Sequence, residues 1–173
     1  MLLTGATLLQ RSIIRSLPSP ALQLQPCGID LTLHKILRWT SPGTIDLDNS
    51  RRQSAATALL PFPSPDEGLR LPQGAYLVQF NEAVDMPRDC MGQIFGRSSL
   101  WRAGVTVTAG VVDAGYQGVL GAMLDVRNPE GVVVFRGARL GQIVVHAMEG
   151  EVEGYKGVYQ GAGGVEGREG LWD

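Results

Sequence analysis

The sequence contains little cysteine, few aromatic residues and no excess of charge of either sign. Its two cysteines, Cys27 and Cys90, form no C-x-x-C pair, which excludes a zinc site of that type. We expect free thiols, although a disulfide between them stays open. A net charge of −2 argues against a general nucleic-acid binder, which needs a basic face.

Long apolar runs are also missing from the sequence. No stretch approaches the roughly 18 residues of a membrane span. The first residues do not have the charged start and apolar core of a signal peptide. We therefore expect a cytoplasmic protein with neither a membrane nor a nucleic acid as partner.

Glycine and proline are plentiful, with 23 and 10 residues in a chain of 173. Frequent tight turns favour short strands over long helices. The spacing of apolar residues predicts one short helix in residues 3–17, capped by Thr4 or Thr7 and ended by Pro18 and Pro20. We expect a long surface loop at 46–74. The first predicted strand is 29–33, with a possible hairpin partner in 35–45. Residues 105–108 and 119–126 are predicted to form a hairpin with each other. The other predicted strands are 75–80, 91–95, 131–135 and 142–147.

This pattern indicates a mainly β protein, a barrel or sandwich with one minor helix. We place the domain at residues 1–149 and a glycine-rich tail at 150–173. Two interpretations of the tail stay open. It is either a disordered end or a mobile flap that closes over a ligand.

The chemistry is concentrated between Gly96 and Gly118. Arg97, Ser98 and Ser99 can neutralise and hydrogen-bond an anion, and Arg102 lies close by. Asp113 follows two valines, so its carboxylate ends a buried strand, and the ring of Tyr116 comes three residues later. These groups together predict a phosphorylated substrate that bears a ring.

Five segments resemble, in order, the motifs of the dUTP diphosphatase (dUTPase) and dCTP deaminase superfamily. They are QPCGIDL at 25–31, GRSSL at 96–100, GVVDAGYQG at 110–118, GARLGQIV at 137–144 and YKGVYQGAGGV at 155–165. The resemblance implies a distorted jelly-roll-like β-barrel, the dUTPase-like β-clip. It also implies a homotrimer with active sites between subunits. The N-terminal helix is more similar to the deaminase and archaeal dUTPase branch than to the short dUTPases.

The resemblance places a water-orienting carboxylate of dUTPases at Asp113. The glutamate that deaminases use for proton transfer falls at Met123, and a thioether cannot carry a proton. The sequence lacks the H-x-E and P-C-x-x-C motifs that zinc-dependent deaminases use. The resemblance therefore implies a dUTP diphosphatase that forms dUMP and pyrophosphate. Two alternatives stay open: a dCTP deaminase or bifunctional enzyme that uses Asp125, and a non-catalytic nucleotide-binding trimer.

The roles implied by the resemblance divide the site into three parts. Tyr116 would stack on the deoxyribose, and the backbone from Thr108 through Ala109 and Gly110 to Val111 would bind uracil. Mg²⁺ would be carried mainly by the triphosphate. The triphosphate would be bound by Arg97, Ser98, Ser99, Arg102 and Gln142, with Tyr159 and Gln160 on the tail.

Two further expectations concern single positions. Gln160 and Val165 stand where the dUTPase tail motif has an arginine and an aromatic residue. Asp30 is interpreted as structural, capping backbone amides near a subunit interface.

Overall fold

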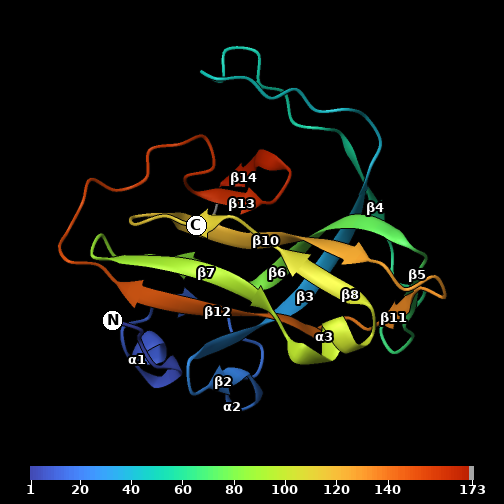
Figure 1. Cartoon of the computed structure of the whole chain (residues 1–173), viewed down its shortest axis with the longest axis horizontal. Helices are drawn as coiled ribbons and strands as arrows, with labels where there is room; N and C mark the ends of the chain where they lie inside the picture. Colours follow the sequence, from blue (N-terminus) through green and yellow to red (C-terminus); the bar gives the residue numbers. More distant parts are fainter. Residues whose placement is uncertain (172–173) are drawn as a thin grey trace.

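The computed structural model describes the backbone of residues 1–171 and the side chains of residues 1–166. Strands dominate these residues, so the predicted mainly β architecture is confirmed (Figure 1). The helices are α1 (Gly5–Gln10), α2 (Pro20–Gln23) and α3 (Ser98–Arg102). The strands are β1 (Ile14–Arg15), β2 (Leu24–Gln25), β3 (Gly28–Trp39), β4 (Thr57–Leu60), β5 (Leu69–Leu71), β6 (Gly74–Asp85), β7 (Cys90–Gly96), β8 (Val105–Thr108), β9 (Val111–Val112), β10 (Gln117–Val126), β11 (Val132–Val134), β12 (Arg139–Ala147), β13 (Ala162–Gly164) and β14 (Gly167–Leu171).

One curled sheet forms the body, in the order β14-β13-β10-β6-β3-β12-β7-β9. Strand β3 belongs to both halves of the curl. Its first part pairs with β12. From Leu33 onward it pairs with β6, with a register shift between Leu33 and Lys35, and from Ile36 it also pairs with β4. Strand β8 pairs antiparallel with β10, which confirms the hairpin predicted on either side of Asp113. A separate two-stranded sheet joins β11 to β5.

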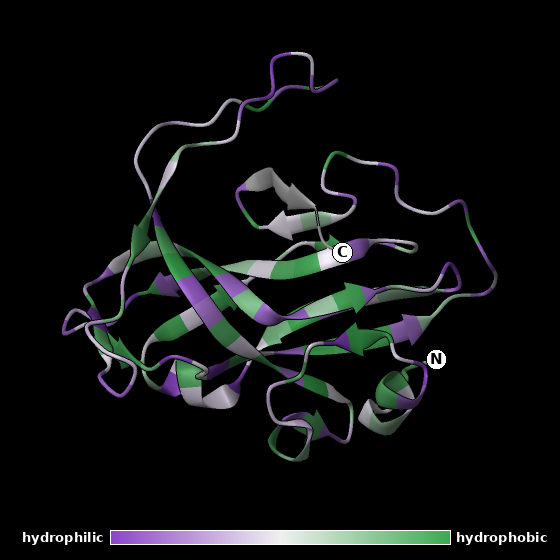
Figure 2. Cartoon of the chain, turned by 180° about the vertical axis from the view of Figure 1, so that it is seen from behind, coloured by the Kyte–Doolittle hydropathy of each residue, from purple (hydrophilic) through white to green (hydrophobic). Residues whose placement is uncertain are grey.

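The core lies inside the curl of the sheet. Figure 2 shows hydrophobic residues along the strands of the body and on α1. Alternate residues of β10 point inward, including Leu120, Ala122 and Leu124, all buried. Met123 and Asp125 therefore share the opposite face, as the period of a strand requires.

The predicted helix at residues 3–17 is shorter than expected. The Thr4 side chain caps α1 by accepting a hydrogen bond from Thr7 N at 3.2 Å, which confirms one of the two predicted caps. The helix stops at Gln10 because Ser12 takes a left-handed φ of 53°. That turn sends Ile13 back into the core and Ile14 into a pairing with β6. Pro20, which was expected only to block a helix, occupies the first turn of α2.

Several strands are longer than predicted. Strand β3 continues to Trp39, so residues 35–39 extend the first strand and form no separate hairpin. The expected loop at 46–74 contains β4 and β5. Residues 40–56, which we term the arm, project from the body (Figure 1). A backbone bond from Thr40 to Ala56 closes the base of the arm, and a bridge between Thr44 and Gln53 pairs its two sides.

A buried carboxylate fastens α2 to the sheet. Glu82 on β6 is fully buried and accepts hydrogen bonds from Thr32 N at 2.8 Å, Thr32 Oγ1 at 2.5 Å and Gln23 Nε2 at 2.6 Å. Burial raises the pKa of Glu82, and these hydrogen bonds lower it by less. No helix in the described part of the chain is long and apolar enough to span a membrane.

Candidate active site

A cavity of about 420 Å³ lies between the β8–β10 hairpin and the C-terminal segment. It brings together six of the predicted site residues from the third motif and its flanks. These are Thr108, Ala109, Gly110, Val111, Asp113 and Tyr116. Tyr159 from the tail lines it as well, together with Tyr155 and Val165. We call this cavity the base pocket, because the resemblance places uracil there. Its lining is mainly apolar, and its polar side chains are those of Asp113, Thr108 and three tyrosines.

The rim of the base pocket is made by the turn between β8 and β9. Thr108 pairs with Met123 across the hairpin, and Val111 pairs with Gln93 on β7. Gly110 lies between them, and a side chain built there would meet no atom within 4 Å. The backbone of this turn is therefore accessible from the pocket, where peptide groups can hydrogen-bond a planar ring.

Asp113 lies at the end of β9, where its carboxylate lines the pocket and is exposed. Among residues 1–166 no side chain or amide donates to it, so the carboxylate is available to a water molecule or a ligand. The turn is held by the bond from Tyr116 N to Asp113 O at 3.2 Å. Gly115 has a φ of 76°, and a Cβ there would lie 2.6 Å from Gly154 Cα. The tail thus passes directly over this turn.

Tyr116 ends the same turn, and its ring lines the pocket. Its hydroxyl donates to Val119 O at 2.9 Å, and its ring meets Tyr155 edge-on with 5.6 Å between centroids. Burial, with a smaller contribution from Tyr155, raises the pKa of Tyr116 to about 12. The phenol therefore stays neutral at physiological pH, and the ring offers an apolar face.

Met123, which stands where the resemblance places the deaminase glutamate, faces the same pocket. Met123 lines the pocket and is 37% exposed. Asp125 does not line it, and its carboxylate accepts a hydrogen bond from Arg127 Nε at 2.8 Å. The carboxylate that could replace a deaminase glutamate is thus bound elsewhere.

The chain from residue 150 to 166, which we term the tail, is folded against the body. Gln160 accepts from Gln117 N at 3.1 Å and donates to Gly115 O at 2.9 Å. Strand β13 then pairs parallel with β10 through Ala162 and Gly118. These bonds fasten the tail to the Asp113 turn and to β10. The predicted tail continues to residue 173, and residues 172–173 lie outside the described part.

Val165 reaches the pocket because Gly121 has no side chain. A Cβ at Gly121 would lie 2.3 Å from Val165 Cγ1. Val165 N also donates to Gln79 Oε1 at 3.2 Å. The tail therefore covers the end of the pocket that is nearest to Gly121.

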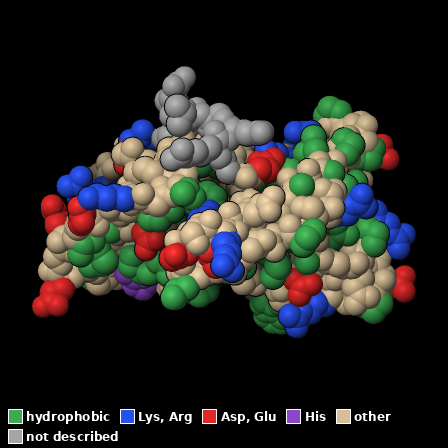
Figure 3. Space-filling view, turned by 90° about the horizontal axis from the view of Figure 1, so that it is seen from above, with side chains coloured by type: hydrophobic (Ala, Val, Ile, Leu, Met, Phe, Trp, Pro, Cys, Tyr) green, Lys and Arg blue, Asp and Glu red, His purple; other side chains and the backbone are tan. Residues whose placement is uncertain are grey.

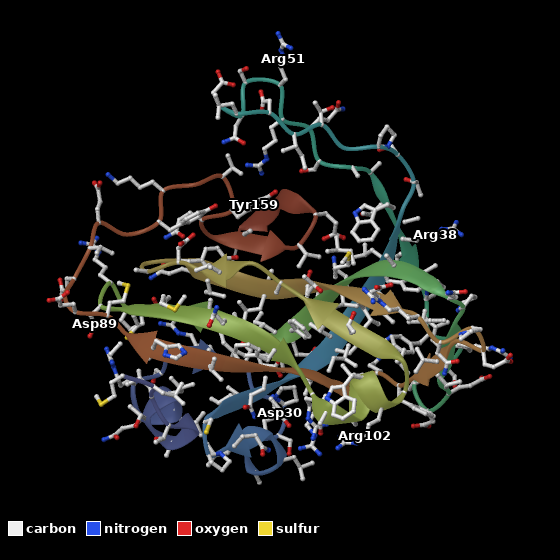
Figure 4. All side chains as sticks on the ribbon, in the orientation of Figure 1. Asp30, Arg38, Arg51, Asp89, Arg102 and Tyr159 are labelled. Atoms are coloured by element: carbon white, nitrogen blue, oxygen red, sulfur yellow. The ribbon has the colours of Figure 1, made fainter. Side chains whose placement is uncertain are left out.

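The predicted phosphate ligands gather at another place. Arg97 Nε lies 3.0 Å from Asp30 Oδ2, and Gln142 Nε2 donates to Asp30 Oδ1 at 3.3 Å. Arg139 contacts the same carboxylate at 3.2 Å. Asp30 is 1% exposed, so its role is structural as expected, but its partners are side chains and not the predicted backbone amides. Figure 4 labels Asp30 near α2, below the strands that carry the pocket.

Helix α3 completes this group, which we call the anion cluster: Arg97, Ser98, Ser99, Arg102 and Gln142. Arg97 is the N-cap residue, and the two serines open the first turn. Arg102 donates to Ser98 O at 3.0 Å and lies over the Trp101 ring at 4.1 Å. No member lines the base pocket, so one chain holds the two halves of the predicted site apart.

Two further residues that contact this region, Tyr155 and Arg52, were not predicted from the sequence. Tyr155 stands inside the glycine-rich tail motif, where an aromatic residue was a usable signal. Arg52 on the arm lies over the Tyr159 ring, 4.8 Å from its centroid, and no local pattern pointed to this contact.

The described residues contain no group of three or more histidine, cysteine, aspartate or glutamate side chains that could hold a metal ion. In the lining of the base pocket the charged side chain is that of Asp113. Figure 3 shows basic and acidic side chains interspersed over the face that bears the tail. This donor set fits a cation that arrives with a polyphosphate better than a resident one.

Residues 4–148 match the family model described as "dCTP deaminase-like". The chain is 42% identical over 139 residues to a "probable deoxyuridine 5′-triphosphate nucleotidohydrolase" of Methanosarcina mazei, covering 80% of this chain and 81% of the relative. It is 34% identical over 140 residues to the deoxyuridine 5′-triphosphate nucleotidohydrolase of Methanocaldococcus jannaschii, covering 80% and 88%.

The fold is similar to that of the 2′-deoxycytidine 5′-triphosphate deaminase from Agrobacterium tumefaciens. The TM-score is 0.62 at 24% identity, over 84% of this chain. The chain spans 48%, about half, of the length of that deaminase. This likeness establishes the fold.

Proposed function

Because the chain belongs to the dCTP deaminase-like family, and its archaeal relatives are named as dUTP hydrolases, we propose that it is a dUTP diphosphatase. It hydrolyses dUTP to dUMP and pyrophosphate. The observation that carries the choice of reaction is the pairing of Asp113 with Met123 in one pocket. A carboxylate is present to orient a water molecule, and a thioether stands where the resemblance places the deaminase glutamate.

Asp113 acts on the water that attacks the α-phosphorus. Its carboxylate is exposed, has no donor within residues 1–166 and ends the turn that borders the base pocket. A carboxylate in this state accepts a hydrogen bond from the water and orients one lone pair toward phosphorus. As the water oxygen forms a bond to the α-phosphorus, the water gives one proton to the Asp113 carboxylate. The bond to the bridging oxygen breaks, and pyrophosphate leaves with its electron pair.

The pocket selects for a deoxynucleotide of uracil through shape and backbone. Uracil hydrogen-bonds the turn from Thr108 to Val111, and the deoxyribose rests on the neutral ring of Tyr116. Gly118 has a φ of 150°, and a Cβ there would lie 2.7 Å from the Tyr116 hydroxyl. The ring is therefore seated against a glycine, which fixes its distance from the sugar.

The triphosphate requires a second subunit. Within residues 1–166 the lining of the base pocket includes no cationic side chain. Arg97 and Gln142 lie beside Asp30 instead, and Ser98, Ser99 and Arg102 follow Arg97 on α3. A homotrimer with sites between subunits joins the base pocket of one copy to the anion cluster of the next. Mg²⁺ carried by the triphosphate would neutralise part of the phosphate charge. The described residues form no group of three or more carboxylate, histidine or cysteine side chains that could hold the ion without the nucleotide.

The tail closes the site as a flap in this proposal. Gln160 fastens it to the Asp113 turn, and Tyr159 and Val165 cover the pocket. Val165 takes the place that an aromatic residue has in the resembling motif, so the base is covered by a smaller apolar surface. The cytoplasmic location expected from the sequence stays a prediction.

Subunit complementation tests the composite site. D113N impairs one half of the site and R97Q impairs the other, so each homotrimer should release little pyrophosphate from dUTP. Mixed trimers refolded from both variants should regain activity, because some interfaces then join two intact halves. A mixture no more active than the separate variants would show that both halves act within one subunit. Wild-type trimers that bind dUTP in solution without hydrolysing it would favour the non-catalytic alternative.

A further inference from the structure

A second cavity of about 490 Å³ lies between the arm and the tail. It shares Leu77, Tyr159 and Val165 with the base pocket, so a common wall separates the two. Figure 4 shows Tyr159 on the tail below the arm, with Arg51 at the outer end of the arm, directed away from the body. The proposed hydrolysis of dUTP gives this second cavity no role.

Arg52 brings an uncompensated positive charge to the cavity wall. Its guanidinium lies 4.8 Å from the centroid of the Tyr159 ring, and no carboxylate pairs with it within residues 1–166. Glu166 also lines the cavity, but Lys35 Nζ lies 2.8 and 2.9 Å from its two oxygens. Because that pair is neutral, Arg52 leaves the cavity with a net charge of about +1.

Neutral hydrogen-bonding side chains surround this charge. The bridge of Thr44 with Gln53, at 2.9 and 3.1 Å, holds the two sides of the arm together. Amides and hydroxyls of this kind donate to phosphate oxygens beside an arginine. The polar side chains that line the cavity are Thr44, Asn49, Gln53, Ser54 and Thr57.

We propose that this cavity is a binding site for a phosphate-bearing anion, with Arg52 as its principal ligand. The guanidinium carbon lies over the Tyr159 ring, and an arginine placed on an aromatic ring can still offer its N–H groups in bidentate bonds to oxygen. An anion bound there connects the arm to the tail. Its occupancy therefore stabilises the tail in the position that covers the base pocket.

Pyrophosphate is the probe that tests this site without requiring any turnover. Calorimetric titration of the full-length protein compares wild type, R52Q and R51Q. Arg51 is the matched control, because it neighbours Arg52 on the same arm but is exposed and does not line the cavity. We expect about tenfold weaker binding in R52Q, from the loss of charge-assisted hydrogen bonds, and unchanged binding in R51Q. Equal affinity in all three proteins overturns the proposal.

Two further measurements show which molecule supplies the anion and how Arg52 contributes to its binding. If the KM for dUTP also rises in R52Q, the site binds phosphates of the substrate; if the KM is unchanged, it binds a free anion. R52K keeps the charge, so it should recover part of the pyrophosphate affinity. An R52K protein as weak as R52Q would mean that Arg52 acts only by stacking on Tyr159, which overturns the anion site. A protein that fails to hydrolyse dUTP but binds pyrophosphate through Arg52 would refute only the proposed function.

Discussion

The carboxylate of Asp30 is the most informative place to perturb the anion cluster. It is 1% exposed and meets three donors: Arg97 Nε at 3.0 Å, Arg139 at 3.2 Å and Gln142 Nε2 at 3.3 Å. The Asp30→Asn substitution keeps the shape but exchanges one acceptor oxygen for an NH₂ group. If the NH₂ group takes the place of Oδ2, it faces both guanidinium groups; if it takes the place of Oδ1, the Gln142 amide has to turn to present its oxygen. In either orientation the negative charge that the two arginines share is lost.

The magnitude follows from these contacts. An unsatisfied buried donor costs about 1–3 kcal/mol. Breaking a fully buried ion pair costs about 3–5 kcal/mol, and the two arginine side chains here are 30% and 33% exposed, which reduces that cost. We therefore expect D30N to lower the free energy of unfolding by about 2–4 kcal/mol. For a chain of this length, that corresponds to a melting temperature lower by roughly 5–15 °C.

Thermal melting of D30N beside D113N measures this effect. Asp113 is exposed and has no donor within residues 1–166, so D113N should melt within about 1–2 °C of wild type while losing activity. D30N should show a different pattern: a large loss of stability, together with a raised KM for dUTP. A D30N protein as stable as wild type would refute the reasoning, because it would mean that the buried carboxylate does not hold the two arginines.

Three other perturbations test separate parts of the structure. Because burial raises the folded-state pKa of Glu82, its stabilising contribution is complete below the unfolded value and is lost as pH rises through the folded one. The difference in free energy of unfolding between wild type and E82Q, measured by urea unfolding, should therefore widen as pH falls toward about 4.5. A difference that narrows contradicts the assignment. Gly121→Ala should displace Val165, whose Cγ1 lies 2.3 Å from the added Cβ, and make the tail more sensitive to limited proteolysis; an equally resistant tail would mean that Val165 is not seated there. Gln160→Ala removes two hydrogen bonds to the Asp113 turn, so kcat for dUTP should fall severalfold while melting is nearly unchanged, and equal kcat would show that this anchor is dispensable.

The parts of the fold that depend on local pattern were predictable from the sequence. The alternation of apolar residues located the hairpin on either side of Asp113, and the motif order identified the family. The end of α1 was not predictable, because it depends on a left-handed Ser12 and on the insertion of Ile13 into the core. Pro20 was misjudged because a proline that ends one helix equally well begins another.

The predicted site residues divide between two places in the fold. The base pocket and the anion cluster lie apart in one chain, and sequence order carries no information on the distance between them. The stacking of Arg52 on Tyr159 joins positions 107 residues apart (159 − 52), with no periodicity to reveal it. Contacts of this kind depend on how the arm and the tail are folded in space.

A product assay on dUTP and dCTP with Mg²⁺ tests the central claim most directly. It should resolve dUMP, pyrophosphate and ammonia for wild type and D113N in the same run. We predict dUMP and pyrophosphate from dUTP, a rate about 10²–10⁴-fold lower in D113N, and no ammonia from dCTP. Ammonia released from dCTP, or undiminished hydrolysis of dUTP by D113N, would contradict the assignment of Asp113 and Met123 to a dUTP diphosphatase.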